Sequence, residues 1–146
     1  MPFLNKKLLT HYCLGSNNLQ LRKQLRLITI IHDTFKYLEE QKRPRTDWSK
    51  HHAIFALNFA KKYIKDKAIL DVIELHDEAY YAWRDFNFGK IASCNKRMNN
   101  LVKRLGNNMQ LFYLFFKCDT QTGDKYQRPI SWFESTVKNI DVVSFS

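Results

Sequence analysis

The sequence predicts an all-α fold, a single-domain bundle of about six helices, and three observations support this. The 146 residues include only four Gly and three Pro, the residue types that most often interrupt helices. Apolar residues recur at helical spacing along most of the chain, whereas the alternation typical of strands is scarce. Apolar residues make up 45% of the sequence and aromatic residues 14%, which suits a globular domain with a full core.

Apolar stripes with a period near 3.6 predict the first three helices. The first helix is expected within residues 19 to 40, and its stripe consists of Leu21, Leu25, Ile28, Ile31, His32 and Phe35. Pro44 and the charged residues around it predict a loop. Asp47 or Ser49 is expected to cap the second helix, and Asp66 the third. The second stripe consists of His52, Ala56, Phe59 and Tyr63, and the third of Ile69, Ile73, His76, Tyr80 and Trp83.

Three further helices complete the predicted bundle. The fourth carries Ile91, Met98, Leu101 and Leu105, and Gly106 is expected to stop it. Residues 109 to 118 are apolar on nearly all faces, so this helix could be wholly buried or could partly face a second subunit of a homodimer. A last short helix carries Ile130, Trp132, Phe133 and Val137. The domain is expected to span residues 1–146, with 1–18 and 141–146 at its periphery.

The net charge indicates which partners suit the protein, and the cysteines indicate its compartment. The net charge of +10 attracts anions, so nucleotides, nucleic acid and acidic surfaces all fit, as does a role in solubility alone. The sequence has no run of 18 apolar residues, so we expect no membrane span. Cys13, Cys94 and Cys118 are odd in number and match no metal-ligand spacing. We therefore expect reduced thiols in a cytoplasmic protein.

Three of the predicted helices carry a histidine on the apolar stripe, namely His32, His52 and His76, and the fifth carries Asp119 beside its aromatic face. One such residue is usually a hydrogen-bonded core residue. Four on separate helices favour a shared metal ion, because an unpaired buried carboxylate costs several kcal/mol and helix bundles often build metal sites between helices. Imidazole and carboxylate ligands without thiolate suit a divalent ion of Mn, Fe, Co, Ni or Zn.

The order of these residues resembles the HD-domain superfamily of metal-dependent phosphohydrolases. The segment HDTFK (32–36) is similar to that family's HD-x-x-K signature. The segments HHAIFA (51–56) and ELHDEAY (74–80) are similar to its two following histidine segments, and FFKCDTQTGD (115–124) to the helix with its closing aspartate. The small residue four positions on favours His52 over His51. The resemblance covers roughly residues 19 to 125.

The resemblance departs from the family at one position. The family opens with a further histidine on a preceding helix, and the candidate here is His11, 21 residues before His32. His11 could be that ligand on a shortened first helix. Alternatively the chain is shortened at its N-terminus, or the ligand is absent, which would weaken the expectation of catalysis.

The resemblance implies a metal-dependent phosphohydrolase that cleaves a nucleotide or related phosphoester through a metal-activated water. It implies that His32, Asp33 and Asp119, with His11, bind one metal, and that His52 and His76 bind a second metal or contact phosphate. Lys36 would hold phosphate, and Arg43 and Arg45 of the following loop could add further phosphate contacts. Asp77 could be a general base, could orient a histidine, or could be an ordinary surface acid.

Two other functions remain open from the sequence. One is a basic helical module that binds nucleic acid and has a degenerate metal site. The other is a di-iron oxygenase, because some proteins of the HD fold activate oxygen with a similar ligand set. The substrate stays open among small nucleotides, dinucleoside polyphosphates and cyclic nucleotides.

Overall fold

The computed structural model describes residues 19–122 and 124–144, and in these residues the fold is entirely helical. It has seven α-helices and three short 3-10 helices, without a β-strand in the described ranges. The α-helices are α2 (Leu19–Ile31), α3 (His52–Ala60), α4 (Lys67–Leu75), α5 (Glu78–Asn87), α6 (Ile91–Leu105), α7 (Met109–Thr120) and α8 (Arg128–Thr136). The 3-10 helices are η1 (Lys36–Leu38), η2 (Trp48–Lys50) and η3 (Gly106–Asn108). The predicted all-α class is confirmed.

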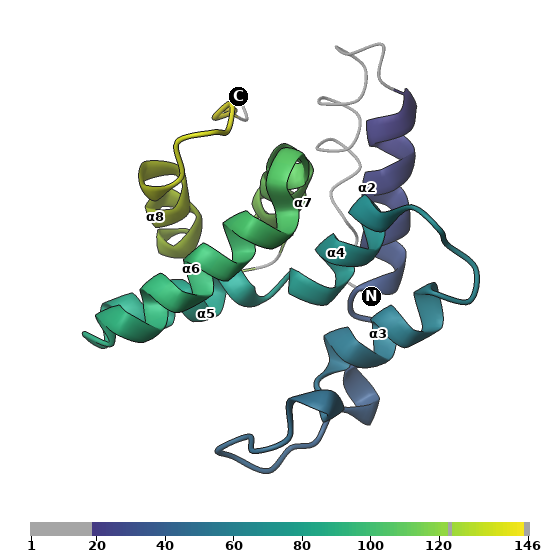
Figure 1. Cartoon of the computed structure of the whole chain (residues 1–146), viewed down its shortest axis with the longest axis horizontal. Helices are drawn as coiled ribbons and strands as arrows, with labels where there is room; N and C mark the ends of the chain where they lie inside the picture. Colours follow the sequence, from purple (N-terminus) through teal and green to yellow (C-terminus); the bar gives the residue numbers. More distant parts are fainter. Residues whose placement is uncertain (1–18, 123, 145–146) are drawn as a thin grey trace.

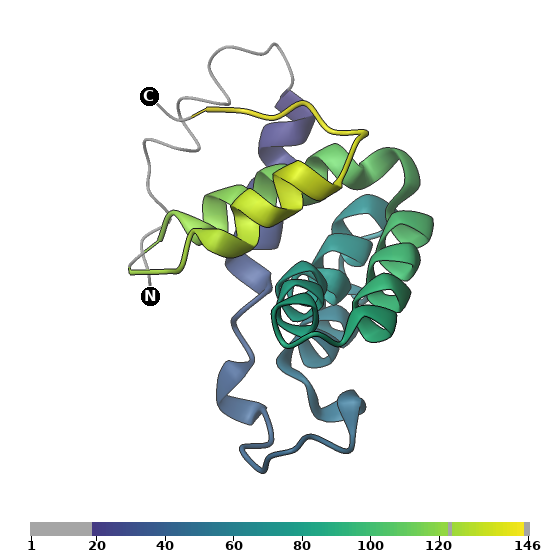
Figure 2. The same cartoon turned by 90° about the vertical axis from the view of Figure 1, so that its left-hand side faces the viewer.

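Helix α7 forms the centre of the core. It packs against α2, α4, α6 and α8, while α5 lies along α6 and α3 against α4 (Figure 1). Nine of its twelve residues are buried, including Phe112, Tyr113 and Phe115, which are at most 1% exposed. The predicted burial on nearly all faces of this helix is therefore confirmed within a single chain. Figure 2 shows α8 running beside α7, with the chain returning along α7 afterwards.

Helix α2 lies within the predicted range of residues 19 to 40 but ends at Ile31, so the predicted helical stripe is wrong for its last two members, His32 and Phe35. The backbone N–H of His32 still donates to the carbonyl of Ile28 at 2.9 Å. The following N–H groups of Thr34 and Lys36 instead donate to carbonyls three residues back, which tightens the chain into turns. The His32–Asp33 pair therefore lies just past the end of a helix. Its two side chains need not point in the directions that a continuing helix would impose.

The predicted third helix is broken into α4 and α5 at His76 and Asp77, so the described chain has seven α-helices where the sequence predicted about six. The ring Nδ1–H of His76 donates to the carbonyl of Ile73 at 2.7 Å and so occupies a backbone acceptor at the end of α4. Asp77 then precedes the new helix. Because the helical register restarts, Tyr80 does not continue the buried stripe and is 41% exposed.

The caps explain where the helices around the site begin. The carboxylate of Asp66 accepts from the N–H of Ala68 at 2.9 Å, as predicted for α4. Asp47 caps η2, and α3 is capped instead by His51, whose Nδ1 accepts from the N–H of Ala53 at 3.1 Å. Neither Asp47 nor Ser49 caps α3, so that prediction is wrong.

The remaining predictions concern the end of α6, the cysteines, membrane spans and the C-terminal residues. Gly106, with a φ of +50°, follows the last residue of α6 as predicted. Cys94 and Cys118 are both buried. None of the helices in the described ranges is long and apolar enough to cross a membrane. The backbone of Asp141 and Val143 hydrogen-bonds to Gln110 and Tyr113 of α7.

Candidate metal centre

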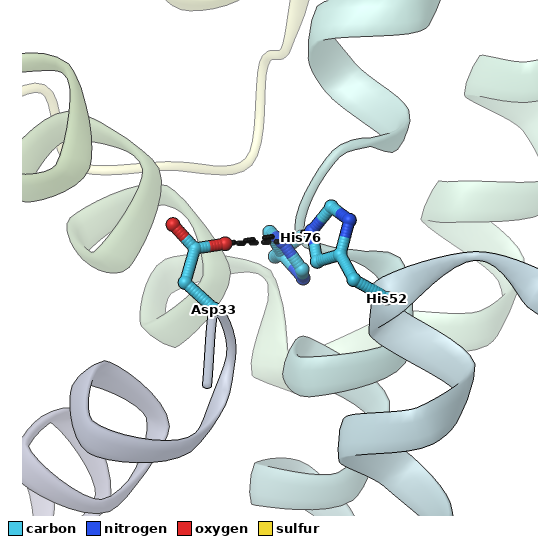
Figure 3. A group of neighbouring side chains, drawn as sticks. All are labelled: Asp33, His52 and His76. Atoms are coloured by element: carbon cyan, nitrogen blue, oxygen red, sulfur yellow. Dashed lines mark hydrogen bonds and ion pairs between the residues drawn. The ribbon is translucent and has the colours of Figure 1, made fainter. Parts of the chain in front are cut away.

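Three histidines from separate helices meet in the interior. His32 follows α2, His52 begins α3 and His76 follows α4, and their exposed fractions are 6%, 3% and 4%. Carboxylates join them from three places: Asp33 from the turn after α2, Asp77 from the break before α5, and Asp119 from the last turn of α7. Figure 3 shows Asp33 pointing toward the rings of His52 and His76.

Each of the three rings is held through its Nδ1 atom. His32 Nδ1 lies 3.1 Å from the carbonyl of Ile28, His76 Nδ1 lies 2.7 Å from the carbonyl of Ile73, and His52 Nδ1 lies 3.0 Å from Oε1 of Glu39. Carbonyl and ionised carboxylate oxygens only accept, so Nδ1 carries the proton in each ring. In the neutral ring the lone pair is then on Nε2, the atom that faces the cluster. Metal-binding histidines are commonly oriented in this way.

If the three rings were neutral, each Nε2 atom would need a hydrogen-bond donor beside it, and no described residue provides one. Nε2 of His52 and Nε2 of His76 are 3.0 Å apart, and two lone pairs at that distance require a proton or a cation between them. Nε2 of His32 is buried without a hydrogen-bond partner among the described residues. Its nearest charged neighbours are carboxylate oxygens of Asp33 and Asp119, at 3.3 Å and 3.7 Å. A cation in this space would give all three rings a partner.

Asp33 lies between two groups of ligand atoms. Its Oδ2 faces His32, while its Oδ1 lies 3.4 Å from Nε2 of His52 and 3.7 Å from Nε2 of His76. Asp77 adds Oδ2 to the second group, 3.3 Å from Nε2 of His52. The ligand atoms of Asp33, His52 and His76 all lie within 4.8 Å of one another. Asp33 therefore faces both His32 and the pair His52 and His76, and with that pair it could hold a metal ion.

Protons balance the carboxylates in the ion-free protein. Burial lowers the pKa of His32, but its contacts with Asp119 and Asp33 outweigh burial and raise this pKa to about 9. Burial likewise opposes the charged form of His52, and Asp33, Asp77 and Glu39 raise its pKa to about 10. Burial opposes ionisation of Asp33, yet the three histidines hold its pKa far below the usual range. A divalent ion would take the place of these protons.

A second group, Glu39, His51 and His52, also brings potential ligand atoms together, but its protons exclude His51 as a ligand. Nδ1 of His51 accepts from the backbone of α3, so Nε2 carries the proton and contacts the hydroxyl of Tyr81 at 2.9 Å. Burial lowers the pKa of His51 to about 4, which keeps the ring neutral. This group therefore orients His52 and does not form a separate metal site.

Both arginines of the loop lie beside Glu39, the residue that holds the ring of His52. Arg45 is 2.7 Å from Oε1 of Glu39, and its side chain is 5% exposed. Arg43 donates to the carbonyls of Glu40 and Lys42 and is 53% exposed. Neither residue lines the cavity at the metal centre, so their predicted contact with substrate stays a prediction. His11 lies outside the described residues.

A cavity of about 340 Å³ opens onto the carboxylates, with two lysines at its wall. Lys36 Nζ lies 2.7 Å from Oδ2 of Asp33, and Lys125 Nζ lies 2.9 Å from Oδ1 of Asp119. The lining residues are Asp33, Lys36, His76, Asp77, Tyr80, Phe116, Asp119, Thr120, Lys125, Tyr126 and Pro129. The predicted site residues in this list are Asp33, Lys36, His76, Asp77 and Asp119.

One residue of this site, Glu39, had no role predicted from the sequence. The contact of Glu39 with His52 joins residues 13 apart and follows no helical spacing. Lys125 follows Asp119 by six residues, in a polar run (120–125) for which the sequence predicted substrate contacts or a hydrogen-bonded support.

Comparisons of the chain with protein-family models, with curated proteins and with solved structures give no match. Fold and site together define an all-α protein with a cluster of histidines and carboxylates that could hold a metal ion. The particular function is therefore inferred from the geometry of this cluster and from the resemblance of its residues to the HD-domain superfamily.

Proposed function

We propose that the protein is a metal-dependent phosphohydrolase of the HD type, acting on a nucleotide or a related phosphoester. One observation carries the proposal: three histidine Nε2 atoms and three carboxylates form one cluster, and His76 and the three carboxylates line a cavity that also holds two lysines. The order of these residues along the chain, His32–Asp33, His52, His76–Asp77 and Asp119, supports the same class.

The residues fit one or two divalent ions. His32, Asp33 and Asp119 would hold one ion, and Asp33, His52 and His76 would hold the other. Nitrogen and oxygen ligands without thiolate suit Mn, Fe, Co, Ni or Zn. A bound divalent ion lowers the pKa of water toward neutrality and offsets negative charge on phosphoryl oxygens.

The remaining side chains of the cavity would bind phosphate and move protons. Lys36 and Lys125 can each donate to a phosphoryl oxygen once the carboxylates that they contact are engaged with metal. In hydrolysis the water oxygen bonds to phosphorus and the ester P–O bond breaks. Asp77 lies beside His52 and His76 and would accept a proton from the attacking water. The leaving oxygen would take up a proton to form the alcohol.

The direct test is phosphate release from a panel of nucleotides and simple phosphoesters. Protein freed of metal with a chelator would be assayed after addition of Mn²⁺, Fe²⁺, Co²⁺, Ni²⁺ or Zn²⁺. We expect metal-dependent hydrolysis that is lost in Asp33→Ala and retained in Asp124→Ala, an exposed acid on the same segment as Lys125. Absence of hydrolysis with every metal, in folded and metal-loaded protein, would contradict the proposal.

A shared carboxylate between two sites also suits a di-iron oxygenase, so the same preparation should be tested with Fe²⁺ for oxygen consumption. The basic composition also suits a nucleic-acid-binding module. Retention of nucleic acid by Asp33→Ala, without hydrolysis by the unaltered protein, would favour that function.

A further inference from the structure

Exposed aromatic rings form one side of the cavity at the metal centre. Tyr126 directly follows Lys125, lines the cavity and is 61% exposed. Its ring centroid lies 6.3 Å from that of Trp83, which in turn lies 5.8 Å from that of Tyr80. Tyr80 lines the cavity as well. The guanidinium of Arg128 lies 5.6 Å from the centroid of the Tyr126 ring, a cation–π contact that supports the ring.

The pairing of lysine and tyrosine gives the cavity two chemically different ends. Lys125 places an ammonium group over Asp119, at the metal centre, whereas Tyr126 presents an exposed aromatic ring. A single exposed tyrosine needs no explanation. Next to a phosphate-binding lysine in the same cavity, it offers a stacking surface for the part of the substrate attached to the phosphate.

The cavity volume suits a small ligand. Ligand pockets commonly enclose about 300 to 1,000 Å³, and this cavity, at about 340 Å³, is near the lower limit. That volume suits a phosphate with one attached group. A flat ring at the exposed end would meet Tyr126.

We propose that Tyr126 stacks on a flat ring of the leaving group while Lys125 binds the phosphate, so that the site prefers nucleoside monophosphates to phosphomonoesters that lack a base. This inference rests on the proposed phosphohydrolase function. Tyr126 is then a specificity-determining residue, since stacking between a base and an aromatic side chain strengthens binding without requiring a particular base.

The test compares a nucleoside 5′-monophosphate with ribose 5-phosphate, which has the same phosphate and sugar but no base. Values of kcat/KM for both would be measured with Mn²⁺-loaded protein. We expect the ratio of the two values to fall about tenfold in Tyr126→Ala and to be preserved in Tyr126→Phe, which keeps the ring. Tyr63→Ala is the matched control, because Tyr63 is 73% exposed and lines a different cavity. An unchanged ratio in Tyr126→Ala would overturn the inference while leaving the hydrolase function standing.

Binding separates this inference from the proposed function if no hydrolysis occurs. Calorimetric titration of the nucleoside monophosphate into Mn²⁺-loaded protein would then be compared between the unaltered chain and Tyr126→Ala. Binding that weakens about tenfold in the variant would support the role of Tyr126 although the hydrolase proposal had failed. Equal binding in both proteins, or no binding to either, would overturn the inference.

Discussion

Nε2 of His52 and Nε2 of His76 lie 3.0 Å apart, although each ring already donates its Nδ1 proton elsewhere, to Glu39 and to the carbonyl of Ile73. Two neutral rings held in this way would oppose one lone pair to another. Either a proton or a metal ion must therefore occupy the space between them. The predictions that follow distinguish these two states and test the residues that maintain the arrangement.

Glu39 is expected to set the metal affinity through His52. Because Oε1 of Glu39 accepts from Nδ1 of His52 at 3.0 Å, Glu39→Ala should release the ring. Loss of such a supporting carboxylate typically costs about 10- to 100-fold in metal affinity or activity. Glu39→Gln keeps an acceptor oxygen and should lose less.

The measurement is competition for Mn²⁺ against a fluorescent chelator, with Glu40→Gln, one residue along the chain, as the matched control. Unaltered metal affinity in folded Glu39→Ala would show that Glu39 stabilises the loop and leaves His52 unaffected.

The ion-free protein should lose stability at alkaline pH. The folded-state pKa values of His32 and His52, about 9 and about 10, lie above the value of 6.5 for an unperturbed histidine. The contribution of a raised pKa is complete below the unfolded value and is lost as pH rises through the folded value. Stability of the ion-free protein should therefore fall between about pH 6.5 and pH 10.

Urea unfolding across that pH range, with a chelator and with Mn²⁺, checks this expectation. Metal-loaded protein should show a flatter profile, because bound metal displaces these protons, and metal binding should release protons into the buffer. A falling profile of equal slope with and without metal would mean that no ion binds at these histidines.

Removal of either lysine should strengthen metal binding and weaken substrate binding. Lys125 contacts Asp119 and Lys36 contacts Asp33, so each lysine competes with a metal ion for a carboxylate. Lys125→Ala and Lys36→Ala should each tighten Mn²⁺ binding. Each should also raise the KM for phosphate substrates roughly tenfold, because a charged hydrogen bond to phosphate is lost.

Chelator competition and steady-state kinetics report the two effects separately. Lys62→Ala, an exposed lysine just past α3, should change neither quantity. If Lys125→Ala weakened metal binding and substrate binding together, the lysine would be needed to shape the site and would not be a phosphate-binding group.

The parts of the fold that follow from local sequence could be predicted. Apolar spacing predicted most helices, and the all-round apolar segment correctly predicted the buried α7. The caps by Asp66 and Gly106 also depend on neighbouring residues alone.

Features that depend on contacts between residues far apart in the sequence could not be predicted from apolar spacing or from local capping residues. The apolar stripe continues through the ends of α2 and α4, so periodicity gave no sign of the turns at His32–Asp33 and His76–Asp77. Those turns bring the doublets together. The support of His52 by Glu39, and of Glu39 by Arg45, joins a loop to a helix start, a contact without a repeating pattern.

The most direct test of the metal centre is calorimetric titration of Mn²⁺ into chelator-stripped protein, followed by metal analysis of the dialysed complex. We predict one or two ions bound per chain by the unaltered protein and by Asp124→Ala. In Asp33→Ala, where the shared carboxylate is removed, we predict loss of this binding. Binding of equal stoichiometry and affinity in Asp33→Ala, or no specific binding by the unaltered protein, would contradict a metal centre at these residues.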